Sequence, residues 1–167
     1  MHQSTVLVVG GTGMLRPAVR SLAEAGSRVL VAARSPKGIT EVGPTGSVSF
    51  VGAHWERPRE LADSVRRAAG GPLERAVLWV HAPFRAAVED ALGDVLADDA
   101  VVVRLYGSAA QEPSPAERPP WTVRNVVLGS KIEAGRRRWL THGEISSGAL
   151  RALEATAPGG AVLRVGD

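Results

Sequence analysis

The sequence predicts an α/β protein built on a mainly parallel sheet, and three features of the chain support this. Short apolar runs rich in Val and Leu alternate with longer amphipathic runs along most of the chain. The apolar runs are continuous rather than alternating with polar residues, as is typical of strands buried on both faces of a sheet. Gly or Pro stands at most of the boundaries between the runs, where turns are expected.

The first half of the chain supplies three strands and two helices. The strands are expected over residues 5–10 ("TVLVVG"), 28–34 ("RVLVAAR") and 47–53 ("SVSFVGA"). One helix is expected over 15–26, with Gly26 as its end, because Gly is the residue most often found just past a helix. A second is expected from Pro58 to the "GGP" stop at 70–72.

The second half continues the alternation and then departs from it. Strands are expected over 75–82 and 100–107, with a helix over 83–99 between them. Residues 107–121 are rich in proline, which excludes another helix there. Two strands over 121–134 and 135–141 would meet in a tight antiparallel turn at Ala134-Gly135, and a helix over 141–160 would start with the capping box Thr141–Glu144. A short strand is expected over 161–165.

These elements predict one Rossmann-type domain over residues 1–167. Right-handed crossovers between parallel strands place helices on both faces of a doubly wound sheet. The antiparallel pair would make the sheet mixed at its C-terminal edge. The length of 167 residues is sufficient for one core and short for two.

Composition excludes several classes of protein. The chain has no cysteine and four scattered histidines, so neither a thiolate site nor a metal site is expected. The net charge of +3 comes from arginines spread along the chain, so nucleic acid is not expected as a partner, and the run Arg136–Arg138 is interpreted as a solvated strand edge. The N-terminal apolar run is too short for a signal core or a membrane span, so a cytoplasmic location is expected.

A glycine turn between the first strand and the first helix is the clearest functional motif. Gly10, Gly11 and Gly13 in "GGTGML" would expose backbone N–H groups at a helix N-terminus, where the helix dipole favours a diphosphate. The third glycine of the dinucleotide fingerprint is replaced by Arg16. Arg16 would either crowd the helix against the sheet or face a phosphate.

The end of the second strand indicates which dinucleotide is bound. Sites for NAD carry an acidic residue there, whereas sites for NADP need a cation for the 2′-phosphate. This chain has Arg34 at that position, followed by Ser35 and, nearby, Lys37. Because guanidinium is always charged and matches phosphate geometry, NADP(H) is preferred over NAD(H).

The motifs "GGTGML", "AAR" and "RWLTHGEISSGALRAL" resemble those of atypical short-chain dehydrogenases/reductases, short bacterial relatives of that family. The resemblance implies that Thr12, Met14 and Leu15 join the glycines in wrapping the cofactor. It also implies that His81 and Ala82, at the end of the fourth strand, lie near the nicotinamide ribose. Trp55, after the third strand, would either lie on the adenine or cover the core.

The catalytic residues of that family are only partly matched. Its members protonate the developing alkoxide with a Tyr whose pKa is lowered by a Lys four residues later, together with a Ser. The only tyrosine here is Tyr106, followed four positions on by Ala110, while Ser108 matches the family's Ser. Tyr106, His81 and Lys131 are the candidate proton donors.

Two functions remain open from the sequence. The first is an NADP(H)-dependent oxidoreductase that transfers hydride to a small carbonyl or alcohol substrate through a non-standard active site. The second is an NADP(H)-binding redox sensor or regulatory module without turnover. A homodimer formed through the last helix or the arginine-rich strand is compatible with either.

Overall fold

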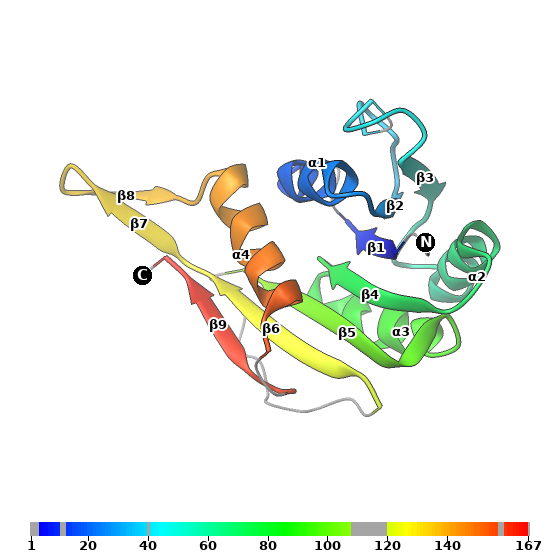
Figure 1. Ribbon diagram of the computed structural model, residues 1–167. Helices are drawn as coiled ribbons and strands as arrows, with labels where there is room; N and C mark the ends of the chain where they lie inside the picture. The colour runs from blue at the N-terminus through cyan, green and yellow to red at the C-terminus, as the bar shows by residue number, and fades with distance from the viewer. Residues whose placement is uncertain (1–3, 11–12, 40, 108–119, 157–158, 167) are drawn as a thin grey trace.

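A seven-stranded sheet is the centre of the computed structural model, which describes residues 4–10, 13–39, 41–107, 120–156 and 159–166 (Figure 1). The strand order is β3-β2-β1-β4-β5-β6-β9, and all six neighbouring pairs are parallel. The order reverses between β1 and β4, as expected of a doubly wound sheet. The bounds are β1 Thr5–Val9, β2 Arg28–Ala33, β3 Val48–Gly52, β4 Leu73–Leu78, β5 Leu96–Tyr106, β6 Thr122–Leu128 and β9 Val162–Val165.

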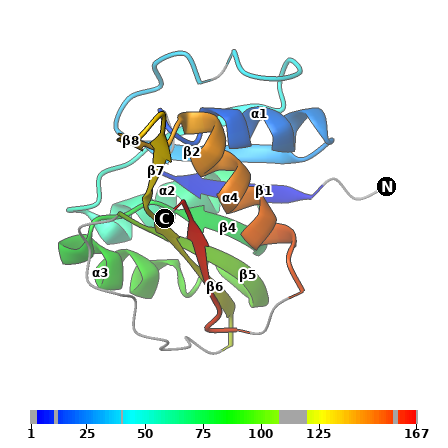
Figure 2. The same ribbon diagram turned by 90° about the vertical axis from the view of Figure 1, so that its left-hand side faces the viewer.

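Four helices cover the two faces of this sheet (Figure 2). Helices α1 (Arg16–Glu24) and α4 (His142–Glu154) pack together on one face, and α2 (Pro58–Ala69) and α3 (Ala82–Leu92) pack on the other. Each face has its own apolar core, which includes Val19 and Ala149 on the first side and Val65 and Val88 on the second. The predicted Rossmann-type architecture is confirmed.

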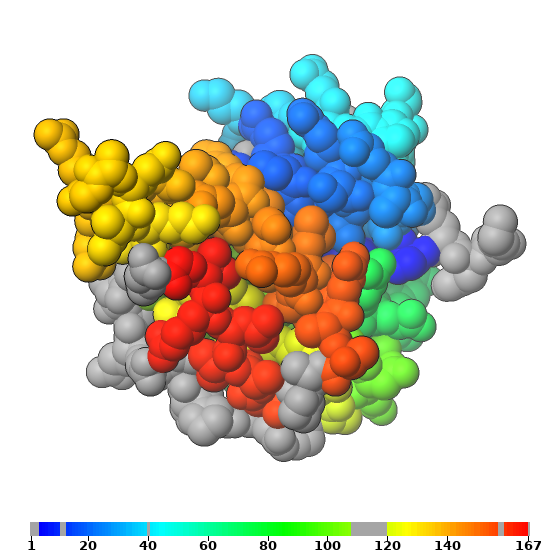
Figure 3. All heavy atoms as spheres, turned by 60° about the vertical axis from the view of Figure 1, so that its left-hand side comes forward, coloured from blue at the N-terminus to red at the C-terminus, as the bar shows by residue number. Residues whose placement is uncertain are grey.

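The antiparallel pair lies outside the main sheet. Strands β7 (Ser130–Glu133) and β8 (Arg136–Trp139) form a separate hairpin, so the seven-stranded sheet is wholly parallel rather than mixed. The strand predicted over 121–134 divides at Gly129, whose N–H donates to the carbonyl of Val165 in the neighbouring β9. Because β6 already pairs with β5 on one side and β9 on the other, no position beside it is left for β7 or β8, and the hairpin forms outside the sheet. The hairpin therefore stands out from the body of the molecule (Figure 3).

The third helix is shorter than the sequence predicts. It was expected to continue to residue 99, but α3 ends at Leu92 and β5 begins at Leu96. Val95 and Leu96 are buried, and Leu96 pairs with Leu73 of β4. Strand pairing therefore outweighs the helical pattern of the segment, as tertiary contacts often do for local propensity.

The sequence signals at both ends of α2 and at the start of α4 are confirmed, whereas α4 ends at Glu154 rather than at residue 160. Pro58 is the first residue of α2, and Gly70 ends it in the left-handed region at a φ of 73°. At the start of α4, the Thr141 hydroxyl accepts from the N–H of Glu144 at 3.1 Å. The Glu144 carboxylate accepts from the N–H of Thr141 at 2.9 Å, which completes the capping box. Most of the proline-rich stretch, residues 108–119, lies outside the described residues.

A buried ion pair joins β5 to α3. The Arg104 guanidinium donates to both carboxylate oxygens of Glu89. Its Nε lies 2.9 Å from Oε1 and 3.1 Å from Oε2, and its Nη2 lies 2.6 Å from Oε1. Only 9% of the Arg104 side chain and 3% of the Glu89 side chain are exposed. The pair fixes α3 against the sheet near the end of β5.

Candidate functional site

A hollow of about 520 Å³ opens at the carboxyl ends of the first four strands. Ligands of doubly wound proteins bind at this edge of the sheet, outside the point where the strand order reverses. The volume is within the range of about 300–1,000 Å³ that is typical of small-molecule sites. The described residues that line it are Gly10, Ala33, Arg34, Ser35, Ala53, Trp55, Glu56, Trp79, His81 and Phe84.

Gly10 is the point at which the glycine turn meets the hollow. Its φ is 80°, and its N–H donates to the carbonyl of Ala32 in β2 at 3.0 Å. A Cβ at this position would lie 2.3 Å from the main-chain oxygen of Trp79. The close approach of the chain after β4 therefore requires glycine here, independently of any ligand.

Gly13 differs from Gly10 in that nothing in the fold requires it. A Cβ there would meet no atom within 4 Å, and the residue is exposed. It lies just before α1, whose N-cap residue Leu15 makes no side-chain capping bond and whose first turn holds no acidic residue. The N–H of Arg16 donates to the carbonyl of Gly13 at 3.1 Å, and Pro17 has no N–H, so an anion would meet the main chain of the turn at Gly13 rather than the first residues of α1. Gly11 and Thr12 lie outside the described residues.

The two residues after Gly13 point into the protein. Leu15 is fully buried, and Met14 packs against the same core. The Met14 carbonyl accepts a hydrogen bond from the hydroxyl of Ser146 in α4 at 2.8 Å. Any contact of Leu15 with a cofactor must therefore come from its main chain.

Arg16 neither crowds α1 against the sheet nor lines the hollow. Its Nη2 donates to the main-chain oxygen of Lys37 at 3.0 Å, beside Gly38. The side chain thus ties the start of α1 to the connection between β2 and β3. Its replacement of the third fingerprint glycine leaves the hollow open.

Arg34 and Ser35 follow β2 directly and are both exposed at the hollow. The Ser35 hydroxyl accepts from the N–H of Lys37 at 3.4 Å, which shapes the turn. Within the part of the chain that the structure describes, the Arg34 guanidinium has no carboxylate partner in an ion pair. A cation with its donors available therefore lies at the position that the sequence predicts.

Aromatic rings also line the hollow. The His81 ring lies edge-on to Trp55 at 4.9 Å and to Trp79 at 5.5 Å between centroids. Phe84 lies 6.2 Å from Trp55. Aromatic faces of this kind are suited to stacking on a planar base. Trp55, whose role the sequence leaves open, lies at the hollow.

Trp79 and Phe84 were missed by reasoning from the sequence. Trp79 stands at the end of an apolar run, "AVLWV", where an aromatic residue is more typical of the core. The one signal was its position immediately after a strand that ends at the ligand-binding edge. His81 lies at the hollow as expected, and Ala82 begins α3 beside it.

The candidate proton donors lie in three separate places. His81 lines the hollow. Tyr106, the last residue of β5, is 7% exposed and lies beneath Arg85, whose guanidinium carbon is 4.1 Å from the ring centre. Lys131 lies on the β7–β8 hairpin in an ion pair with Glu144. Ser108 lies outside the described residues, so the structure brings only His81 to the hollow.

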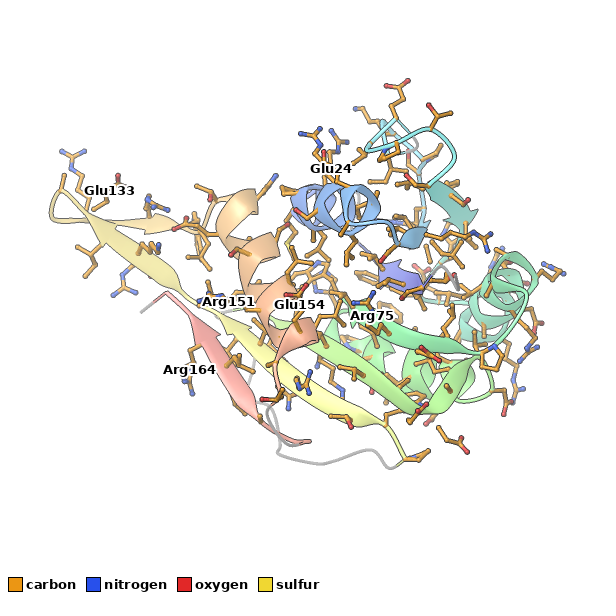
Figure 4. The ribbon with its side chains drawn as sticks, viewed as in Figure 1. Glu24, Arg75, Glu133, Arg151, Glu154 and Arg164 are labelled. Atoms are coloured by element: carbon orange, nitrogen blue, oxygen red, sulfur yellow. The ribbon has the colours of Figure 1, made fainter. Side chains whose placement is uncertain are left out.

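The arginine-rich strand anchors the hairpin. Arg138 bonds to Glu133 across the hairpin and to Glu144 of α4 at 2.8 Å. These partners raise the pKa of Arg138, while Arg138 and then Lys131 hold the pKa of Glu144 well below its usual range. Figure 4 shows Glu133 near the hairpin tip, far from α1. None of the charged residues of this cluster is among the described residues that line the hollow.

The described residues contain no cluster of three or more His, Asp or Glu side chains placed to hold a metal ion. Among the helices that the structure describes, none is both long enough and apolar enough to cross a membrane.

The fold is that of short-chain dehydrogenases and reductases. A reductase/Diels-Alderase, MalC, from Malbranchea aurantiaca superposes with a TM-score of 0.76 at 13% identity, over 99% of this chain and 95% of that one. A short-chain dehydrogenase from Bacillus anthracis superposes with a TM-score of 0.74 at 11% identity, over 98% of this chain and 94% of that one. A short-chain dehydrogenase/reductase from Serratia marcescens superposes with a TM-score of 0.70 at 18% identity, over 98% of this chain and 96% of that one. No family model and no curated protein sequence matches the chain.

Proposed function

We propose that this chain, which has the fold of the short-chain dehydrogenases and reductases over nearly its whole length, binds NADP(H) in the hollow beside Gly10. One observation supports this most strongly: the glycine turn and the Arg34–Ser35 pair open into the same hollow. A dinucleotide needs phosphate-binding groups at both of these places.

The residues around the hollow fit the parts of this cofactor. The turn at Gly13, at the positive end of the α1 dipole, would bind the pyrophosphate, because the open space at Gly13 lets a phosphate approach the backbone. Arg34 and Ser35 would bind the 2′-phosphate, and the ring of Trp55 would stack on the adenine. When bound, the cofactor supplies a hydride donor or acceptor.

Arg34 is also the basis for preferring NADP(H) over NAD(H). An acidic residue at the end of β2 would bind the ribose hydroxyl of NAD, and Arg34 stands there instead. The carboxylate that lines the hollow, Glu56, comes from the connection between β3 and α2. It is therefore not the residue that distinguishes the two cofactors.

Calorimetric titration of the Arg34→Asp variant tests the proposal. NADPH affinity is expected to fall at least about tenfold, because a hydrogen bond to a charged group contributes roughly 1.5–3 kcal/mol. NADH affinity should stay the same or rise. Arg20→Asp is the matched control, since Arg20 is exposed on α1 and does not line the hollow. Equal binding of both cofactors by wild type and Arg34→Asp would contradict the assignment.

Hydride transfer to a small carbonyl substrate is the second candidate function, and His81 is the observation that favours it. Its imidazole lines the hollow and would be the proton donor. Oxidation of NADPH with a panel of aldehydes and ketones tests this, and the His81→Ala variant should lose about 10²–10⁴-fold in rate. If Tyr106 only closes the end of β5, Tyr106→Phe changes the rate by less than about tenfold. The cytoplasmic location and the homodimer stay predictions.

A further inference from the structure

The hollow is lined mainly from one half of the ligand-binding edge. In a doubly wound sheet, β1 to β3 form one mononucleotide-binding half and β4 to β6 form the other. The described residues that line the hollow follow β1, β2, β3 and β4, and β5 and β6 contribute none of them. The described lining thus comes mainly from the first half, and Trp79, His81 and Phe84 are added from the start of the second.

The indole of Trp79 extends across the second half. A Cβ placed on Gly10, after β1, would lie 3.3 Å from Trp79 Cδ1, and a Cβ placed on Gly107, after β5, would lie 3.6 Å from Trp79 Cη2. Cδ1 and Cη2 are at opposite ends of the indole. The ring therefore bridges the end of β1 and the end of β5, with β4 between them.

Neighbouring contacts hold Trp79 in that position. The side chain is partly buried and packs against the core beneath α1 and α4. The His81 ring lies edge-on to the indole at 5.5 Å between centroids. The main-chain N–H of Trp79 donates to the carbonyl of Val9 at 3.0 Å. Rotation of the indole away from this edge would remove its contacts with the core.

The end of β5 is closed by a second aromatic group. Tyr106 is 7% exposed, and the guanidinium of Arg85 lies over its ring at 4.1 Å. Gly107, the next residue, is the one in contact range of Trp79. Among the described residues, two large side chains therefore lie at the edge where the second mononucleotide of a dinucleotide would bind.

We infer that the site binds the adenosine 2′-phosphate half of NADP(H) and leaves the nicotinamide half unbound. The ligand class is then an adenosine 2′,5′-bisphosphate unit, whether free or as part of NADP(H). This inference rests on the proposed NADP(H) binding and narrows it. It is an alternative to the second candidate function, because a nicotinamide that is left in water is not positioned for hydride transfer.

The first test is a calorimetric comparison of three ligands on the wild-type protein. Adenosine 2′,5′-bisphosphate and NADPH should bind with dissociation constants within about threefold of each other, and nicotinamide mononucleotide should not bind. NADPH that binds at least about tenfold tighter than adenosine 2′,5′-bisphosphate overturns the inference while leaving the proposed function intact. Failure of both adenosine ligands to bind overturns both.

The fluorescence of the dihydronicotinamide group gives a second readout on the same protein. Direct excitation of this group at saturating protein should give the emission of free NADPH, because the ring stays in water. A blue-shifted and enhanced emission would show that the ring enters a protected site and would contradict the inference. This measurement needs no variant and does not depend on turnover.

The Trp79→Ala variant tests the role of the indole directly. Opening the second half should raise the affinity for NADPH relative to adenosine 2′,5′-bisphosphate by about tenfold or more. Trp139→Ala is the matched control, because Trp139 is 77% exposed on the β7–β8 hairpin. A folded Trp79→Ala protein in which the ratio of the NADPH affinity to the adenosine 2′,5′-bisphosphate affinity is unchanged contradicts the inference. If that variant does not fold, the same ratio measured on the wild-type protein decides.

Discussion

Breaking the ion pair between Glu89 and Arg104 should destabilise the protein more than any other single loss of charge on α3. The two side chains are almost fully buried and are joined by three hydrogen bonds of 2.6 to 3.1 Å. Glu89→Gln keeps the shape of the side chain and removes the charge that faces Arg104. A buried guanidinium is then left without that carboxylate.

The expected cost follows from the burial of the pair. Removal of one partner of a buried pair costs about 3–5 kcal/mol, and we expect about 3 kcal/mol because glutamine keeps one acceptor oxygen. For a protein of this size, each kcal/mol lowers Tm by about 2–4 °C, so Glu89→Gln should lower it by about 6–12 °C. Replacement of both partners by apolar residues should cost less than the sum of the single changes.

Urea unfolding monitored by circular dichroism, together with a thermal scan, measures the loss. Glu24→Gln is the control, since Glu24 is an exposed residue of α1, labelled in Figure 4, and should change the free energy of unfolding by less than about 0.5 kcal/mol. A loss below about 1 kcal/mol for Glu89→Gln would refute the reasoning that this pair is desolvated and mutually dependent.

Three further predictions concern the glycine turn and the hairpin anchor. Gly10→Ala should destabilise the protein by at least about 1–3 kcal/mol in urea unfolding, because its φ is positive and its Cβ would meet the Trp79 carbonyl; a wild-type midpoint would contradict this. Gly13→Ala should leave stability within about 0.5 kcal/mol of wild type but weaken NADPH binding about tenfold in calorimetry, and unchanged binding would exclude a phosphate there. The folded pKa of Glu144 lies below its unfolded value of about 4.3, so its ion pairs stabilise the fold above that pH and are lost as pH falls toward the folded pKa. The difference in unfolding midpoint between wild type and Glu144→Gln should therefore shrink from pH 7 to pH 3, and a constant difference would be evidence against this anchor.

The strands, both ends of α2 and the start of α4 were predictable because their signals are local. The Val-rich runs of β1 and β2 are buried on both faces, which produces continuous apolar segments. Gly70 and the Thr141–Glu144 box act within one helical turn. The end of α3 was not predictable in this way, because Leu96 belongs to β5 through its pairing with a residue in β4.

The position of several candidate residues was predictable from their place at the end of a strand, while their roles stay predictions. Gly10, Arg34, Ser35 and His81 all lie at the hollow, because the carboxyl ends of parallel strands meet at one edge of a sheet. Trp79 carries no such signal, since an aromatic residue after an apolar strand is equally suited to the core. Its position across the second half of the edge depends on contacts with Gly10 and Gly107, which lie far apart in the sequence.

Titration of the wild-type protein with NADPH and NADH in parallel calorimetric experiments tests the central claim most directly. The account predicts that NADPH binds at least about tenfold more tightly than NADH, because Arg34 and Ser35 are available to the 2′-phosphate at the hollow. Equal affinities would contradict the role of Arg34. Failure of both to bind would contradict the assignment of the hollow as a cofactor site.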